Sequence, residues 1–463
     1  MILDDISNFI LDYDLNQESP ETIQMAKFAF LDFLGVTLGG SREEPSIITL
    51  KTLKKVFSKT NLKIKSSVIG SVNKLDILNS GFINGISAHN LELDDGHKIA
   101  QMHLGSVIFP TAISISEGYN LEGRDFLEAV ILGYNIGIFL GSLVNPQHRN
   151  NGFHTSGTIG TFVAGAVASK LLNFNKEEIL NTLGLCGTQA AGLLESGHSG
   201  SMGKPFNVGK AVYNGILASE LAKNGFTGSN SIFDGKNGFL NSFVFKSEIL
   251  NKKDIMENIN SISLKEIYFK KYPFCRHLHS SIDTALKLRN NICEEYGSID
   301  KILIKTYDIA SQHNNFNPKN REDLKHSLPY AVAIAIVCGE LSVKNINNLI
   351  ENGLFEENTL NNKVNDIKII ANKIKIDMDP ELNALFPDKR PSTIIIKLDE
   401  RFRGGLFQNT TLIPKGDIEN PLSLNELLDK FKSINPHYDI SNLSIIDNIE
   451  NYPFRRAFDT LNK

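Results

Sequence analysis

The chain has 463 residues and a formal net charge of −4, with acidic and basic residues interspersed along it. This balance argues against a nucleic-acid-binding surface, and the length exceeds what one hydrophobic core usually holds, so we expect two domains. The acidic N-terminal residues lack a signal-peptide pattern, and no run reaches the ~18 apolar residues of a membrane span. We therefore expect a protein without a membrane segment that binds a small molecule.

The cysteines are few and irregularly spaced, at Cys186, Cys275, Cys293 and Cys338. They form no CxxC pair and no cluster-ligand pattern, which disfavours an iron–sulfur centre. A reduced, cytoplasmic protein is the simple expectation.

Residues 3–40 are expected to form two helices, the second ending at the paired glycines Gly39 and Gly40, which suit a C-cap. Apolar helices are also expected over residues 111–119 and 123–143.

The most informative stretch lies between these helices. It crowds histidines and carboxylates into an apolar context, at His89, Glu92, Asp94, Asp95, His97 and His103. The apolar spacing predicts a helix that carries His89 and Glu92 on one face, with Gly96 allowing a sharp exit. Carboxylates beside imidazoles either bind a metal or orient a histidine for proton transfer. The plainer alternative is solvated helix-end acids and a core histidine.

A second stretch, residues 152–172, predicts a buried helix. Small residues recur at one face, at Gly157, Gly160, Ala164 and Ala168, and a matching stripe follows at Ala211, Gly215, Ala218 and Ala222. Two such stripes predict two buried helices in close contact. His154 precedes the first helix, with Thr155 and Ser156 as candidate caps. An imidazole at a helix N-terminus is biased towards its neutral, proton-accepting form, although His154 could equally be structural.

Basic residues mark two further candidate sites. Lys204 lies in a Gly/Ser-rich loop at the start of a helix, where a cation could meet a substrate carboxylate. The stretch YFKKYPFCRHLHSS gathers Lys270, Lys271, Arg276, His277 and His279. This density of basic residues in an acidic protein indicates an anion site. The competing interpretations are an ordinary surface lysine for Lys204 and a solvated basic loop for the second stretch.

The next part of the sequence contains segments with the composition of β-strands. Residues 301–307, 371–379 and 392–398 have strand composition, and Ser327 with Pro329 predicts a capped helix. Residues 422–434 return to a helical period. The sequence thus predicts a mainly α protein with a smaller α+β part.

Together these motifs resemble the MmgE/PrpD family, which includes 2-methylcitrate dehydratase, cis-aconitate decarboxylase and iminodisuccinate epimerase. The resemblance rests on HNLELDDGH, HLGSVIFP, GFHTSGTIGTF, SGSMGKPFNVGKAVYNGILASELAKNGFTG, KKYPFCRH, HSLPYAVA and NPLSLNELLDKF, in this order along the chain. The chain departs from the dehydratase and decarboxylase pattern at Gly96 and His97, which leaves the substrate open.

The resemblance implies an all-helical domain from residues 1–265 and 396–463, an α+β lid domain from 266–395, a homodimer, and an active site between the domains without metal or cofactor. The site residues it implies are Asp94, His103, His154, Lys204, Lys270 and His277, with Tyr330 in addition. We assign Asp94, His103, His154, Lys204 and His277 as catalytic, and we assign substrate binding to Lys270, Arg276, Asp95, His97 and Tyr330.

The expected activity is that of a cofactor-independent lyase on a small di- or tricarboxylate. Proton removal next to a carboxylate creates an enolate-like anion that needs cations close by. Our sequence-based hypothesis makes His154 the base and His103, oriented by Asp94 or Asp95, the acid. Dicarboxylate epimerisation could use the same residues. The rival functions are a metal-dependent hydrolase with the ligands His89, Asp94, Asp95 and His97, and a non-catalytic carboxylate-binding protein.

Overall fold

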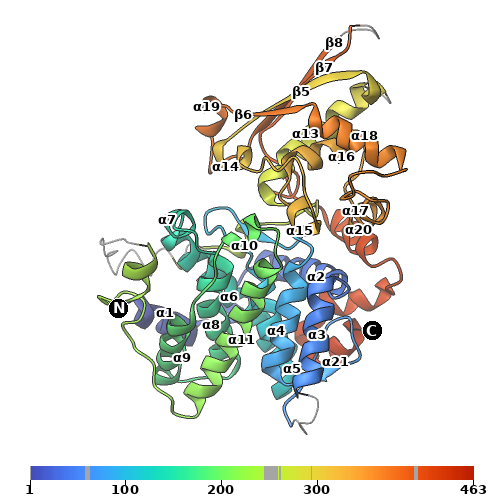
Figure 1. Ribbon diagram of the computed structural model, residues 1–463. Coiled ribbons are helices and arrows are strands. Elements are labelled where there is room, and N and C mark those ends of the chain that lie inside the picture. Colours follow the sequence, from blue (N-terminus) through green and yellow to red (C-terminus); the bar gives the residue numbers. More distant parts are fainter. Residues whose placement is uncertain are drawn as a thin grey trace. The chain divides into compact units, whose positions relative to one another are not determined.

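A computed structural model describes residues 2–57, 63–244, 259, 262–292, 295–400 and 405–462. The chain forms two compact units (Figure 1). Unit 1 comprises Met1–Glu195, Met202–Tyr268 and Leu427–Lys463, and unit 2 comprises Ser196–Ser201 and Phe269–Glu426. Each unit is described by itself.

Unit 1 is built from helices. They are α1 (Ile2–Asp12), α2 (Pro20–Gly40), α3 (Glu44–Phe57), α4 (Ile77–His89), α5 (Gly105–Tyr119), α6 (Gly123–Val144), α7 (Gln147–Asn150), α8 (Thr155–Leu171), α9 (Lys176–Gln189), α11 (Gly203–Lys223) and α21 (Phe454–Leu461), with a 3₁₀ segment over Ile440–Asn451. Helix α20 (Leu424–Ile434) enters this unit at Leu427. Short two-residue ladders pair β1 (Ser66–Ser67) with β2 (Lys74–Leu75), and β3 (Gly96–His97) with β4 (Ile267–Tyr268).

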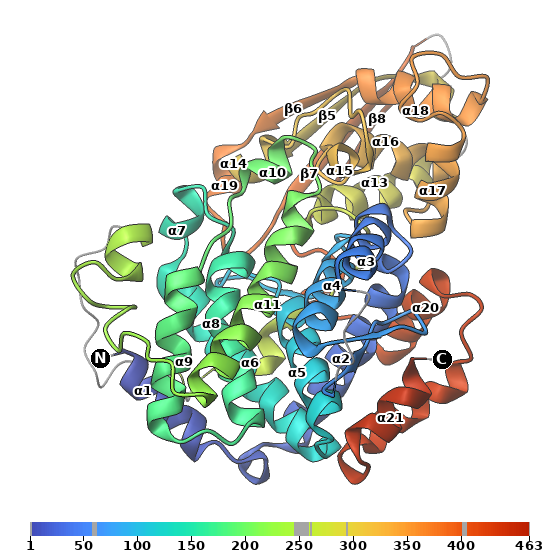
Figure 2. The same cartoon turned by 60° about the horizontal axis from the view of Figure 1, so that its bottom comes forward.

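Helix α11 packs against both α4 and α8 (Figure 2). The predicted close contact of the two small-residue stripes is confirmed. A Cβ added to Gly215 of α11 would lie 2.3 Å from Cβ of Ala164 on α8. Larger residues at these positions would hold the helices apart, so the stripe sets how closely α8 and α11 approach.

The paired glycines of α2 were expected to cap the helix, and this prediction is wrong. Gly39 and Gly40 are its last helical residues, and Ser41 is the C-cap in a right-handed conformation. A Cβ at Gly40 would lie 1.9 Å from the Ser87 carbonyl oxygen of α4. The glycine therefore permits close packing of α2 on α4 rather than a turn.

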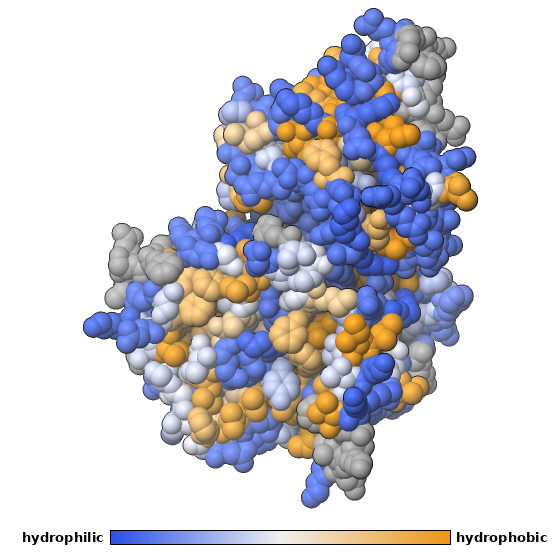
Figure 3. All heavy atoms as spheres, viewed as in Figure 1, coloured by the Kyte–Doolittle hydropathy of each residue, from blue (hydrophilic) through white to orange (hydrophobic). Residues whose placement is uncertain are grey.

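Helix α6 is long and apolar enough to cross a membrane, but 83% of its apolar window is buried inside the protein. Helices α16 (Leu328–Cys338) and α17 (Val343–Glu351) pass the same test only as a pair bent by 98°. Hydrophilic and hydrophobic residues are mixed on the face seen in Figure 3. The burial of α6 is that of a core helix.

Unit 2 contains a four-stranded sheet in the order β6-β5-β7-β8. Its strands are β5 (Ile299–Thr306), β6 (Ile374–Met378), β7 (Ser392–Leu398) and β8 (Gly405–Thr411). Strands β5 and β6 are parallel, and the other two pairings are antiparallel. The further helices are α13 (His279–Ile292), α14 (Asp308–Ser311), α15 (Arg321–Leu324), α18 (Asn362–Asn372) and α19 (Pro380–Asn383). Helix α10 (Glu195–His198) also belongs to unit 2, except for its first residue, Glu195.

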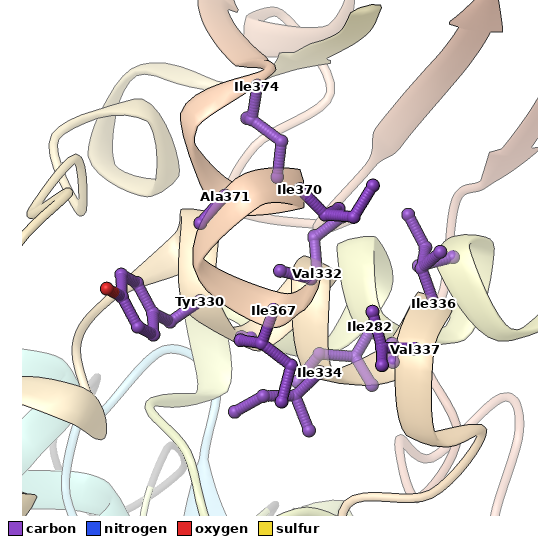
Figure 4. Packing of buried hydrophobic residues seen from close by; sticks show 14 of the residues in the cluster. Ile282, Tyr330, Val332, Ile334, Ile336, Val337, Ile367, Ile370, Ala371 and Ile374 are labelled. Carbon is purple, nitrogen blue, oxygen red and sulfur yellow. The ribbon is translucent and has the colours of Figure 1, made fainter. Parts of the chain in front are cut away.

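The core of unit 2 lies between the sheet and helices α13, α16 and α18 (Figure 4). Ser327 caps α16 as predicted, accepting a hydrogen bond from the Tyr330 amide. The mainly α class with a smaller α+β part is confirmed.

The boundary between the units differs from the expected residue 396. Strand β7 runs to Leu398 and pairs with β8, whose sequence was not recognised as a strand. Beyond β8, the Phe269 amide donates to the Gly416 carbonyl. These backbone hydrogen bonds tie residues up to Gly416 to unit 2, which extends to Glu426.

Candidate active site

The carboxylate of Asp94 lies between two imidazoles in unit 1. His89 is the last residue of α4, and its Nδ1 donates to Asp94 Oδ2 at 2.7 Å. His103 Nδ1 lies 3.6 Å from Asp94 Oδ1, and the rings of His89 and His103 are 4.8 Å apart. The buried Nε2 of His89 has no hydrogen-bond partner within the described part of the chain. The sequence-predicted pairing of carboxylate and imidazole is therefore present.

The helix in this stretch ends earlier than expected. Glu92 lies outside α4 with a left-handed φ of 52°, a conformation that costs a non-glycine residue of order 1 kcal/mol or more. Gly96 belongs to β3 instead of a helix exit, and a Cβ there would lie 2.5 Å from the Tyr268 hydroxyl. The sharp turn thus falls at Glu92, and Gly96 makes room for a tyrosine ring.

Asp95 is hydrogen-bonded to His103 and to residues of the neighbouring helices. Its carboxylate accepts hydrogen bonds from the Tyr134 hydroxyl at 2.8 Å and from the Gly105 amide at 3.0 Å, and its carbonyl oxygen accepts from His103 Nδ1 at 2.8 Å. Burial, together with the neighbouring charge of Asp94, raises the pKa of Asp95 to about 7. These contacts give the side chain a positioning role and do not support its predicted contact with substrate.

His154 is the N-cap residue of α8, and its ring lies 5.7 Å from that of His89. Burial, and then the nearby His89 and Lys204, hold the pKa of His154 well below its usual range. The direction of this shift agrees with the neutral imidazole that the sequence predicts, and its main cause is burial. Thr155 and Ser156 do not cap the helix as expected, since the Ser156 hydroxyl accepts from the His103 amide at 3.0 Å.

Lys204, the second residue of α11, donates to the Glu92 carboxylate in a short contact. The side chains are only 14% and 4% exposed, which rules out the ordinary surface lysine. A buried ion pair of this kind fixes both the cation and the left-handed Glu92 beside the imidazoles.

His97 has its contacts with other residues of unit 1. Its Nδ1 accepts from the Ala100 amide at 3.0 Å, and its Nε2 lies 3.5 Å from the Glu266 carboxylate. Both ring nitrogens are thus engaged within the protein, which does not support the predicted role in substrate binding. The four ligands of the hydrolase hypothesis are not brought together, because His97 and Asp95 have these other partners. A different set of side chains in this unit, His89, Asp94 and His103, does lie close enough to share a metal ion.

Two of the site residues predicted in unit 2, Lys270 and Arg276, are buried. Lys270 is fully buried, and its charge helps to lower the pKa of His279, after burial and Arg276. The buried Arg276 guanidinium donates to Asp417 at 3.1 Å and to the Lys415 carbonyl at 3.1 Å. These hydrogen bonds give Arg276 a structural role and do not support substrate binding.

His277 and Tyr330 are the remaining predicted residues. His277 Nδ1 lies 2.7 Å from the Tyr307 hydroxyl. Tyr330 lies on α16, and burial raises its pKa. Figure 4 shows its hydroxyl directed away from the labelled isoleucines, which leaves the polar end of the ring at the edge of the core.

Comparison with known proteins decides the family. The MmgE/PrpD N-terminal domain matches residues 4–250, and the MmgE/PrpD C-terminal domain matches residues 272–447. The chain belongs to the MmgE/PrpD family. Similar members include cis-aconitate decarboxylase of Homo sapiens, 23% identical over 89% of this chain and 83% of that protein. Another is 2-methylcitrate dehydratase of Escherichia coli strain K12, which is 23% identical over 92% of this chain and 88% of that protein. A cis-aconitate decarboxylase-like protein of Aspergillus oryzae is 25% identical over 68% of each chain.

Two features of this MmgE/PrpD chain escaped the sequence analysis. Asn207 of α11 donates its amide to His154 Nδ1 at 3.4 Å. It lies inside the motif that contains Lys204, but it was not singled out there. Cys275, His313 and His326 converge within unit 2. For Cys275, burial raises the thiol pKa, but the facing His313 and His326 outweigh it, so the pKa of Cys275 lies well below its usual range. His326 opens the HSLPYAVA motif, which was the one available signal.

Proposed function

We propose that this chain is a cofactor-independent lyase that removes a proton next to a carboxylate of a small di- or tricarboxylate. The observation that carries the proposal is the Asp94 carboxylate between His89 and His103, with the His154 ring next to that of His89. The Lys204 cation, paired with Glu92, lies near enough to His154 to affect its pKa. Membership of a family that contains a cis-aconitate decarboxylase and a 2-methylcitrate dehydratase supports it.

We infer the proton-transfer roles from the hydrogen bonds of the two imidazoles. The Asp95 carbonyl oxygen can only accept, so His103 Nδ1 carries the proton and Nε2 is the basic atom of the neutral ring. Proton uptake at Nε2 creates an imidazolium whose charge the Asp94 carboxylate, 3.6 Å from Nδ1, stabilises. His103 is therefore the proposed base.

His154 has the opposite tautomer. The Asn207 amide nitrogen also donates to the Leu193 carbonyl at 3.2 Å, which identifies it as the nitrogen end of the side chain. His154 Nδ1 therefore accepts, and Nε2 carries the proton of the neutral ring. A neutral imidazole that donates can protonate a leaving hydroxyl or hold a developing oxyanion. The proposed roles of His103 and His154 are the reverse of the sequence-based hypothesis.

Lys204 supplies the cation for the enolate-like anion in this proposal, and Glu92 holds the ammonium group in place. Of the residues of unit 2, Lys270 is retained as a proposed substrate-binding residue and His277 as a proposed catalytic residue. We also propose a homodimer and a cytoplasmic location, which light scattering and cell fractionation would test.

The test is proton NMR of chelator-treated protein incubated with citrate, 2-methylcitrate, cis-aconitate and iminodisuccinate in turn. We expect an alkene or a decarboxylated product from one tricarboxylate. A change in the configuration of iminodisuccinate alone would replace the lyase by an epimerase.

Variants connect the reaction to the site. His103→Gln and His154→Gln should each lower the rate about 10²- to 10⁴-fold. His437→Gln, at an exposed position in the same unit, is the matched control and should not change the rate. Turnover that returns only with added metal would favour the hydrolase, and binding without turnover of any compound would favour the carboxylate-binding protein.

A further inference from the structure

Three side chains of unit 2 that have no part in the proposed reaction offer one sulfur and two nitrogen atoms to a common point. Their ligand atoms, from Cys275, His313 and His326, all lie within 4.8 Å of one another. Cys275 Sγ is 3.7 Å from His313 Nε2, and the rings of His313 and His326 stack with centroids 5.6 Å apart.

The separation of the sulfur and one nitrogen matches that around a tetrahedral zinc ion. With Zn–S near 2.3 Å and Zn–N near 2.0–2.1 Å, tetrahedral angles separate a sulfur and a nitrogen ligand by about 3.6 Å. The 3.7 Å separation of Cys275 Sγ and His313 Nε2 therefore needs almost no adjustment. Three protein ligands of this kind leave a fourth position for water or another small ligand.

The backbone already holds the three residues together. The Cys275 amide donates to the Lys325 carbonyl at 2.9 Å, one residue before His326. The Leu328 amide donates to the His313 carbonyl at 2.9 Å. These two hydrogen bonds join positions 50 and 15 residues apart, so the ligands are already ordered before a cation binds.

The exposure of the three side chains and the types of their ligand atoms are also consistent with a metal site. Cys275 is buried, whereas His313 and His326 are partly exposed, which gives an ion a route to the sulfur. Thiolate and imidazole together select zinc-class ions over the oxygen-seeking magnesium and calcium. We propose that Cys275, His313 and His326 form a binding site for a zinc-class divalent cation.

The site adjoins a residue with a predicted role in the reaction. The His277 ring lies 5.8 Å from that of His313. A cation held by the cluster would place positive charge close to His277, which makes the site a point where zinc can modulate the enzyme. Metal binding itself is independent of the proposed lyase activity and can be measured without a substrate.

The test uses the full chain, stripped of metal and titrated with Co²⁺ and then Zn²⁺. Cobalt bound to a thiolate gives a sulfur-to-metal charge-transfer band in the near ultraviolet, which zinc should then bleach. This signal separates the site from the sulfur-free group of His89, Asp94 and His103. We expect one such site per chain.

Cys275→Ser should abolish the band, and His313→Gln should weaken zinc binding more than about tenfold, since even outer-shell partners are worth about 10- to 100-fold. Cys338→Ser removes another cysteine of unit 2 and should leave both signals unchanged. If Cys275→Ser fails to fold, His313→Gln with its smaller change decides the outcome. Absence of the charge-transfer band in the wild type, or its retention in Cys275→Ser, would overturn the proposal.

Discussion

Asp95→Asn should change how stability depends on pH. The asparagine keeps the shape of the buried side chain, and its oxygen can still accept from the Gly105 amide while its nitrogen donates to the Tyr134 hydroxyl. It therefore imitates the protonated carboxyl group. Comparing Asp95→Asn with the wild type therefore isolates the effect of ionising Asp95 on stability.

The size of the effect follows from the pKa of Asp95, which rises from 3.8 to about 7 on folding. The folded chain then binds this proton more tightly than the unfolded chain, so the resulting stability is fully present below pH 3.8 and is lost as the pH rises through 7. At about 1.4 kcal/mol for each pH unit, the full loss is ~4 kcal/mol. Between pH 5 and pH 8 the linkage relation gives about 2.5 kcal/mol of it.

The assay is chemical denaturation of both proteins, followed by circular dichroism at pH 5, 6, 7 and 8. The free energy of unfolding of Asp95→Asn should gain about 2.5 kcal/mol on the wild type across this range, because all other groups titrate in both proteins. Asp429→Asn, an exposed position of the same unit, should run parallel to the wild type. Parallel curves for Asp95→Asn as well would refute the assignment of a buried carboxyl group that titrates near neutral pH.

Two further substitutions test the packing and the structural ion pair. Gly215→Ala should lower the free energy of unfolding by about 1–3 kcal/mol, since the new methyl group would lie 2.3 Å from Cβ of Ala164. Gly297→Ala, where nothing lies within 4 Å, should be close to neutral in the same thermal denaturation, and equal effects would contradict the close helix contact. Arg276→Lys should lower stability by about 1.5–3 kcal/mol through its weakened contact with Asp417, while a change in substrate KM at unchanged stability would instead return Arg276 to substrate binding.

Local patterns predicted the parts of the structure that depend on local physics. The small-residue stripes predicted how closely α8 and α11 pack, because only such residues let two helix backbones approach. Ser327 was recognised as a cap because capping needs one side chain and one nearby amide. His89, at the end of α4, and Asp94, in the segment that follows it, are only five residues apart.

The features that were missed depend on distant parts of the chain. Lys204 and Glu92 are 112 positions apart, and their contact follows from the packing of α11 on α4. The end of α4 at His89 could not be predicted either, because the apolar spacing continues to Leu93 while the chain already turns at Glu92. Strand β8 was missed since it is an edge strand with mostly polar or exposed residues, and the pattern expected of a half-buried strand is weak there.

The central claim is that His103 removes a proton from the substrate and His154 donates one. The most direct measurement is deuterium exchange into the substrate in heavy water, with wild type, His103→Gln and His154→Gln compared by proton NMR. We predict that His103→Gln abolishes exchange at the carbon next to the carboxylate, while His154→Gln retains exchange but forms product slowly. Exchange that survives in His103→Gln and disappears in His154→Gln would contradict the assignment and restore His154 as the base.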